Sequence, residues 1–160
     1  METAVIYFSR SGVTKKAAEN MAKIIKADLR EIVCLEKSEG FLGFMKAGYQ
    51  AMTKKEARIS LVFEDVKKYD LVIVCSPVWA GNLCSPARAF LNKYGRQLNH
   101  TAFILTHGDK KNNYINIIKE MEKLIDNKAI AFASLVSDEN SDYSSELLSF
   151  AKRIAENLPQ

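Results

Sequence analysis

The feature that most constrains the fold of this chain is residues 4–25, with the sequence AVIYFSRSGVTKKAAENMAKII. It begins with the apolar run 4–8, which predicts a buried β-strand. Apolar residues then recur at helical spacing from Ala17 to Ile25, which predicts an amphipathic helix. A strand, a tight turn and a helix in this order form the basic unit of a sheet covered by helices.

The turn at residues 9–14 is rich in hydroxyl groups, from Ser9, Ser11 and Thr14, and contains Gly12. The first backbone N–H groups of the following helix lack intrahelical partners and carry the positive end of the helix dipole. A phosphate binds readily at such a place, and Gly12 allows a positive φ and a close approach of the backbone. An ordinary connection in which Thr14 caps the helix would show the same pattern, so the turn alone leaves both interpretations open.

Predicted strands and helices alternate along the rest of the chain. The run 70–76 is continuous and β-branched, which is typical of a central parallel strand. Ser85 and Pro86 form an N-cap and N1 pair, and Gly95 is expected just after the end of the same helix. The alternation predicts an α/β fold, a parallel sheet with helices on both faces. Further strands are predicted at 29–35, 100–106 and 128–136, and helices at 85–94, 113–126 and 143–158.

The segment 37–55 does not fit this alternation simply. Its large apolar residues recur roughly at helical spacing, whereas Gly43 and Gly48 each weaken a helix by ~1 kcal/mol. Two interpretations stay open: a loose amphipathic helix over a sheet edge, or a flap that shields a ligand or docks a partner. A short extended piece at 60–63 and a connector or helical turn at 64–68 follow. The apolar residues are Phe41, Phe44, Met45, Tyr49 and Met52.

Three chemically distinctive loops follow predicted parallel strands, at residues 9–14, 77–82 and 106–110. In parallel sheets, ligands bind at the carboxyl ends of the strands, where the strand order reverses. We therefore expect the three loops to meet at one edge of the sheet and to form one binding site.

The composition excludes several classes of protein. The chain has 160 residues, the usual size of one domain, so we predict a single domain over residues 1–160. It is 48% hydrophobic and 26% charged, which argues against disorder. No apolar run approaches ~18 residues, so no membrane span is expected. The start, METAVIYFS, lacks the features of a signal peptide.

The charge and the cysteine content indicate which ligands and which cellular compartment to expect. The net charge is +4, but the lysines are spread along the chain, so we expect no nucleic-acid surface and leave open an anionic ligand or an acidic partner. Cys34, Cys75 and Cys84 lack the spacing of a metal site, so we expect no metal and a reduced, cytoplasmic chain.

The chain resembles the flavodoxin-like family over nearly its whole length. The matching stretches are YFSRSGVTKKAAE, YDLVIVCSPVWAGNLCSPARAFL and the THGD turn. The resemblance implies a three-layer α-β-α fold with a five-stranded parallel sheet in the order 2-1-3-4-5. It also implies a single domain over residues 1–160 that binds FMN.

The first loop resembles the family's FMN-phosphate loop, Ser/Thr-x-Ser/Thr-Gly-x-Thr. The family commonly has Asn where this chain has Val13, which removes one side-chain contact and leaves the backbone N–H. Arg10 either reaches toward the phosphate or points to solvent. The resemblance assigns the phosphate to Ser9, Arg10, Ser11, Gly12, Val13 and Thr14.

The second loop resembles the one that runs along the isoalloxazine ring. The resemblance implies that Trp79 stacks on the ring, that the Gly81 peptide reorients beside it, and that Asn82 donates to its polar edge. A tryptophan in the core is the alternative. The loop consists of Pro77, Val78, Trp79, Ala80, Gly81 and Asn82.

The third loop resembles the family's second flavin loop, at the pyrimidine side of the ring. Its residues are Thr106, His107, Gly108 and Asp109. His107 is a polar wall, a proton relay or an exposed loop histidine, and we expect the exposed one. Cys84 lies near this site in the sequence, but no CxxC motif accompanies it, so we expect no thiol chemistry.

These features lead to the hypothesis of an FMN-binding redox protein. One form is an oxidoreductase that passes electrons from NAD(P)H to a quinone or similar acceptor, and we favour it because electron-carrier flavodoxins tend to be strongly acidic. A one-electron carrier served by a reductase is the second form, and a flavin-free binding module is an alternative from another class. The segment 41–52 fits a lid or a homodimer surface. No residue stands out as a general base, so FMN would carry the chemistry.

Overall fold

A computed structural model describes residues 1–36, 40–60, 65–137 and 141–159. Its centre is a sheet of five parallel strands in the order β2-β1-β5-β7-β8, with β6 paired antiparallel to β5. Numbered along the chain, the parallel strands have the order 2-1-3-4-5, so the predicted topology is confirmed. The strands are β1 (Thr3–Tyr7), β2 (Asp28–Glu31), β5 (Leu71–Trp79), β6 (Asn82–Leu83), β7 (His100–His107) and β8 (Ala131–Val136).

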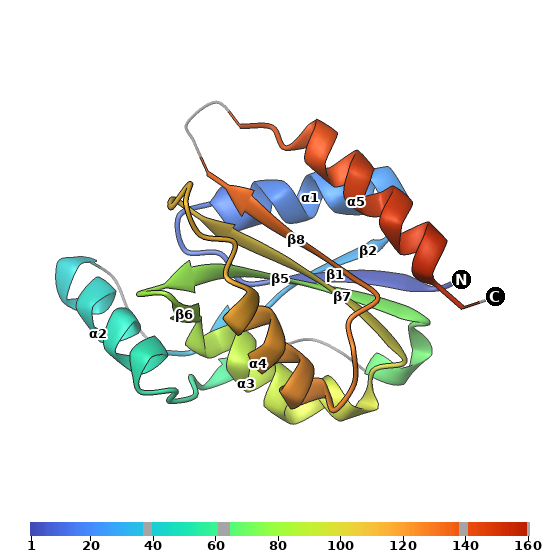
Figure 1. Ribbon diagram of the computed structural model, residues 1–160. Helices are drawn as coiled ribbons and strands as arrows, with labels where there is room; N and C mark the ends of the chain where they lie inside the picture. The colour runs from blue at the N-terminus through green and yellow to red at the C-terminus, as the bar shows by residue number, and fades with distance from the viewer. Residues whose placement is uncertain (37–39, 61–64, 138–140, 160) are drawn as a thin grey trace.

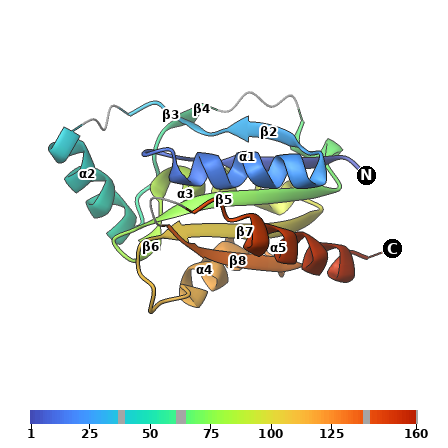
Figure 2. The ribbon, with the colours of Figure 1, turned by 90° about the horizontal axis from the view of Figure 1, so that it is seen from above.

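Helices cover both faces of the sheet, as Figure 1 and Figure 2 show. The helices α1 (Val13–Ile25) and α5 (Ser144–Asn157) lie on one face, and α3 (Ser85–Tyr94) and α4 (Ile115–Ile125) lie on the other. The three-layer α-β-α architecture is therefore confirmed. Among the described helices, none has the length and apolar character needed to cross a bilayer.

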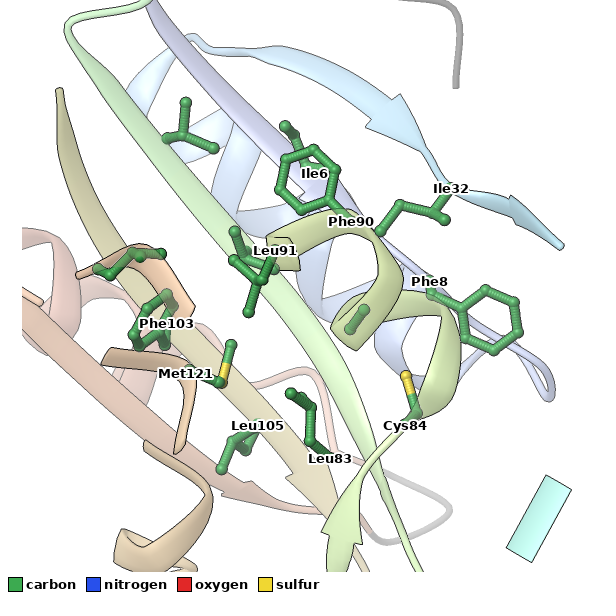
Figure 3. Close-up of a cluster of buried hydrophobic side chains, with 14 of the residues drawn as sticks. Ile6, Phe8, Ile32, Leu83, Cys84, Phe90, Leu91, Phe103, Leu105 and Met121 are labelled. Atoms are coloured by element: carbon green, nitrogen blue, oxygen red, sulfur yellow. The ribbon is translucent and has the colours of Figure 1, made fainter. Parts of the chain in front are cut away.

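The core forms two clusters because successive side chains of a buried strand point to opposite faces. On β5, Ile73 packs toward α1 and α5, whereas Val72 and Val74 pack toward α3 and α4. Each large apolar side chain buried in this way contributes about 1.5–3 kcal/mol to folding. Figure 3 shows part of the second cluster, including Ile6, Phe90, Leu91, Phe103, Leu105 and Met121.

The helix α2 (Gly40–Met52) belongs to neither layer. Both ribbon views place it beyond the carboxyl ends of the strands, beside β6 (Figure 1, Figure 2). The prediction of a helix within 37–55 is thus confirmed, although residues 37–39 and the side chains of Phe41 and Phe44 lie outside the described part.

The predicted strand at 29–35 is present as two short strands that belong to different sheets. The sheet strand β2 ends at Glu31, and the N–H of buried Ile32 donates to the Tyr7 carbonyl at 2.7 Å. The chain then leaves the main sheet, and β3 (Val33–Cys34) pairs antiparallel with β4 (Ile59–Ser60). The rest of the predicted extended piece, residues 61–63, lies outside the described residues. The helical turn expected near 64–68 is present as the 3-10 helix η1 (Val66–Lys68).

The ends of α3 also differ from prediction. Cys84 is the N-cap, and the Ser85 hydroxyl is buried without a hydrogen-bond partner, so Ser85 does not cap the helix. Gly95 has a φ of −54° and opens the 3-10 helix η2 (Gly95–Gln97) instead of adopting the left-handed conformation. Glycine fits here because a Cβ would lie 3.0 Å from the Leu124 carbonyl oxygen.

Candidate functional site

The three distinctive loops begin at adjacent strand ends. Tyr7 of β1 is paired with Cys75 of β5, and Pro77 of β5 is paired with Thr106 of β7. The register therefore brings the ends of β1, β5 and β7 to one edge of the sheet, as the sequence predicts. The order of the strands reverses between β1 and β5, which is where α/β sheets bind ligands.

The first loop leaves the amino end of α1 open. Gly12 is the N-cap with a φ of +93°, and its N–H donates to Ser9 Oγ at 3.1 Å. The first intrahelical bond runs from the Lys16 N–H to the Gly12 carbonyl at 3.0 Å, and no side chain caps the helix. The N–H groups of the first turn are thus available to an anion, and no acidic residue lies in that turn.

Thr14 does not cap α1, so the capping interpretation is wrong. Its side chain is only 2% exposed and lies in the second position of the helix. Its Oγ1 lies 2.7 Å from Thr106 Oγ1 at the end of β7, and either hydroxyl could be the donor. This bond joins the first loop to the third across 92 residues of sequence.

The second loop is a β-hairpin and not an irregular loop. The strand β5 continues through Trp79, which pairs with Asn82 of β6. Ala80 and Gly81 form the turn with φ values of +47° and +72°, and the Asn82 side chain donates to the Ala80 carbonyl at 2.7 Å. Two positive φ values are typical of a tight hairpin turn. Trp79 is half-buried and meets the Phe8 ring edge-on, with ring centroids 5.4 Å apart.

A cavity of about 430 Å³ lies between this hairpin and α2. The hairpin contributes Val78, Trp79 and Ala80, and Arg10 of the first loop also lines it. Among the described residues of the lining, Arg10 is the one that is charged, and most of the others are apolar. The residues from α2 that line it, chiefly Met45, Gly48, Tyr49 and Met52, were absent from the predicted site. The helical spacing of Met45, Tyr49 and Met52 is the sequence signal that indicates an apolar face on this segment.

His107 is buried, so the expectation of an exposed loop histidine is wrong. The strand β7 extends through His107, which pairs with Val136 of β8 and is 6% exposed. Its Nε2 lies 2.7 Å from Ser134 Oγ, and its ring meets that of Tyr114 with centroids 4.8 Å apart. Burial lowers the pKa of His107, which favours the neutral imidazole. Its Nδ1 is buried without a hydrogen-bond partner.

The rest of the third loop lies apart from the cavity at Trp79. Gly108 and Asp109 are exposed, and Asp109 accepts the Lys111 N–H at 2.9 Å. His107 lines a separate hollow of about 350 Å³ with Lys110, Asn112 and Ser134. The Thr14–Thr106 bond is therefore the direct link between the third loop and the first.

A family profile described as Flavodoxin matches residues 2–123, which is most of the chain. The chain belongs to the flavodoxin family. The resemblance read from the sequence is thereby confirmed. Among curated proteins, no relative matches this flavodoxin.

Solved structures of flavoproteins resemble this flavodoxin over nearly its whole length. A flavoprotein from Lactobacillus acidophilus, crystallised in complex with FMN, is 26% identical, with a TM-score of 0.73 over 94% of this chain and 98% of that one. The apo-form of the flavoprotein from the same organism, solved by NMR, is 25% identical, with a TM-score of 0.67 over 88% and 96%. A WrbA-like flavodoxin from Agrobacterium tumefaciens is 16% identical, with a TM-score of 0.60 over 99% of both chains, and shows the shared fold.

Two of the three cysteines of this flavodoxin, Cys75 and Cys84, are poorly suited to thiol chemistry. Cys84 is fully buried, with its Sγ 3.2 Å from Ser76 Oγ, and burial raises its pKa to about 11. Burial likewise raises the pKa of Cys75 in the centre of β5. Because the thiolate is the reactive form, both groups are held in the unreactive state at neutral pH.

Proposed function

We propose that this flavodoxin binds FMN and acts as an oxidoreductase that passes electrons from NAD(P)H to a quinone or a similar flat, apolar acceptor. The observation that carries the proposal is the cavity of about 430 Å³ between Trp79 and α2. The ring of FMN would take up much of this cavity against Trp79, and the apolar side chains of α2 would then form a wall beside the ring, where a flat acceptor has to lie. A one-electron carrier exchanges electrons through an exposed flavin edge and needs no such wall. An oxidoreductase must hold its small substrate next to the flavin.

The first loop fits the phosphate of FMN. The open N–H groups of the first turn of α1, the positive φ of Gly12 and the hydroxyl groups of Ser9 and Ser11 form a set of donors. In this arrangement Val13 contributes only its backbone N–H. The FMN complex of the Lactobacillus relative supports this assignment of the cofactor.

The hairpin fits the ring of FMN. The ring of Trp79 packs edge-on with that of Phe8, and the backbone of Trp79 is paired with Asn82. The position of Trp79 is therefore fixed before a flavin binds. A flavin bound here would supply the redox chemistry, taking up a hydride and passing electrons on. Trp79 would orient the ring, and Met45 and Met52 would keep water from the reacting face.

Arg10 gives the cavity its polarity. Among the described residues of the lining its guanidinium carries the positive charge, which favours an acceptor that carries a carbonyl oxygen or a negative group. The net charge of +4 also suits a nucleotide donor with several negative charges.

A second candidate function is electron transfer to a protein partner. Leu42 of α2 is 82% exposed and Met52 is 62% exposed, so α2 presents apolar side chains to solvent as well as to the cavity. Such a surface favours docking of a redox protein beside the flavin.

The first experiment is an absorption spectrum of the purified protein with FMN, followed by addition of NADPH without oxygen. We expect a bound flavin that bleaches directly to the two-electron reduced form and recovers when a quinone is added. A bound flavin that ignores NADPH and holds a long-lived one-electron reduced form would favour the carrier. Failure to bind FMN would contradict both and leave a flavin-free module.

A matched pair of variants on α2 separates the two candidate functions. Met52 lines the cavity, and Leu42 on the same helix does not. Under our proposal, Met52→Glu raises the KM for a benzoquinone by about tenfold because a carboxylate is placed in an apolar site, while Leu42→Glu changes it little. Equal effects of the two variants on transfer to a protein acceptor, with no effect on a quinone, would support the carrier.

A further inference from the structure

We propose that Thr106 is a positioning residue for the phosphate of FMN, acting through Thr14. The inference rests on the FMN binding proposed above and adds a residue outside the phosphate loop. It also gives Thr106 a role different from contact with the pyrimidine side of the flavin, which the resemblance to the family implies.

The geometry places the two hydroxyl groups in one buried bond. Thr14 follows the N-cap Gly12 by two residues, so it belongs to the first turn of α1, whose N–H groups are open. Thr106 is 3% exposed and is not among the residues that line the cavity at Trp79. The distance of 2.7 Å between the two Oγ1 atoms is typical of a hydroxyl–hydroxyl hydrogen bond.

The chemistry of the phosphate decides the direction of this bond. A hydroxyl group has one proton to donate and two lone pairs to accept with, whereas a phosphate dianion only accepts. If Thr14 gives its one proton to a phosphate, its bond with Thr106 is kept only when Thr106 is the donor in that bond. A bound phosphate therefore orders the chain of bonds as Thr106 to Thr14 to phosphate.

Without the Thr106 hydroxyl, the orientation of Thr14 is lost. A threonine near the start of a helix then turns toward neighbouring backbone acceptors, which compete with the ligand for its proton. Because the Thr14–Thr106 bond is buried, water does not readily replace the missing partner. The effect should be confined to ligands that carry the phosphate.

The test compares the dissociation constants of FMN and riboflavin, which lacks the phosphate, by quenching of flavin fluorescence. We expect Thr106→Val to weaken FMN binding by about tenfold, the equivalent of one hydrogen bond, and to leave riboflavin binding within about twofold. Thr106→Ser keeps the hydroxyl and should restore the FMN affinity. In the double variant with Thr14→Val, the loss should equal that of Thr14→Val alone, because the two residues act as one unit.

Thr101→Val is the matched control. Thr101 lies at the other end of β7 and is also 3% exposed, so its substitution makes the same chemical change in the same strand far from the loops. It should leave both dissociation constants unchanged. Thermal unfolding of each variant without flavin shows whether the fold is intact, and Thr106→Ala replaces Thr106→Val if the valine variant does not fold.

Three results with the variants would overturn the inference and leave the proposed function intact. Unchanged FMN affinity in Thr106→Val would show that Thr14 needs no orientation. Equal weakening of FMN and riboflavin would place the effect at the ring or in the fold. Fully additive losses in the double variant would show that the two residues act separately. Failure of the unaltered protein to bind FMN would overturn the proposed function as well. This failure is distinguishable from the other results because it is seen in the protein without any substitution.

Discussion

The helices α1 and α2 both border the candidate site and are both 13 residues long, yet they are held in place differently. On α1, Met21 and its small neighbours Ala17 and Ala18 are completely buried against the sheet. Among the described side chains of α2, the fully or nearly buried ones are small, Ala47 and Ala51, while Leu42, Met45, Tyr49 and Met52 are exposed or line the cavity. Tyr49, for example, is 55% exposed.

Polar contacts replace part of the apolar packing that α2 lacks. The Glu36 carboxylate accepts from the Gln50 side chain at 2.9 Å and lies 3.3 Å from Lys46 Nζ. After the end of the helix, Lys54 Nζ lies 3.8 Å from Glu120 of α4. Ion pairs whose lysine is exposed, as Lys46 and Lys54 are, contribute about 0–1 kcal/mol, far less than a buried methionine.

The comparison indicates that the two helices differ in rigidity at the candidate site. Apolar packing fixes α1, so the proposed donors for the phosphate would stand in a rigid frame. Among the described residues, weak polar contacts and small apolar ones hold α2, so we expect this wall of the cavity to move more readily than α1. Three measurements test this contrast.

The largest expected difference comes from truncating one methionine on each helix. Met21→Ala should reduce the free energy of unfolding by about 2–5 kcal/mol, because it removes a fully buried side chain and leaves a cavity. Met52→Ala removes the same group from a 62% exposed position and should change stability by less than about 0.5 kcal/mol. Urea denaturation measures both. Similar losses in the two variants would show that α2 is packed as firmly as α1.

Smaller effects on stability, of opposite sign, are expected when Gly12 at the start of α1 and Gly48 in α2 are each replaced by alanine. Gly12 has a φ of +93°, so Gly12→Ala should cost about 1–2 kcal/mol although nothing lies within 4 Å of the added Cβ. Gly48 is inside α2, and its Cβ would meet only Ala80 Cβ, at 3.9 Å. Gly48→Ala should therefore stabilise the protein by about 0.5–1 kcal/mol through helix propensity. Thermal unfolding of the flavin-free protein should show shifts of opposite sign, and a drop in both would contradict this view of α2.

Much of the fold was predictable because the signals are local. The change from a continuous apolar run to helical spacing after Ser9 marks β1 and α1, and the β-branched run from Leu71 marks the centre of the sheet. The hairpin was not predicted, since Pro77 and Gly81 are typical turn residues and the pairing of Trp79 with Asn82 is a tertiary outcome. Propensity identifies the turn at Ala80–Gly81 but not the strand on either side of it.

The sequence predicts which loops form the candidate site, but it does not predict the contacts between residues far apart in the chain. The hydroxyl pattern of residues 9–14 indicates an anion site, but nothing in the sequence pairs Thr14 with Thr106. The burial of His107 depends on Ser134, which lies 27 residues further on in the next strand. The apolar residues of α2 were visible as a pattern, and their place beside Trp79 depends on how the chain passes the end of the sheet.

The smallest expected effect is a difference in pH dependence between the two helices. The hydrogen bond from Gln50 is the main cause that lowers the pKa of Glu36 below its ordinary value of 4.5, with the Arg58 N–H and Lys46 adding to it. A carboxylate whose pKa is lower in the folded state stabilises that state above the ordinary value. This stabilisation is lost as the pH falls below 4.5 and through the pKa of the folded state.

Acidification should therefore loosen α2 before α1, whose link from Thr14 to Thr106 does not titrate in this range. Hydrogen-exchange protection, corrected for the intrinsic rate at each pH, should decrease in α2 below pH 4.5 while the protection of α1 stays nearly constant. Glu36→Gln is the control, because it keeps the shape and removes the titrating group, and α2 should then be loosened at every pH without the acid transition. An equal decrease in both helices would mean that α2 opens only when the whole domain does, and the cavity wall would then be as rigid as the phosphate site.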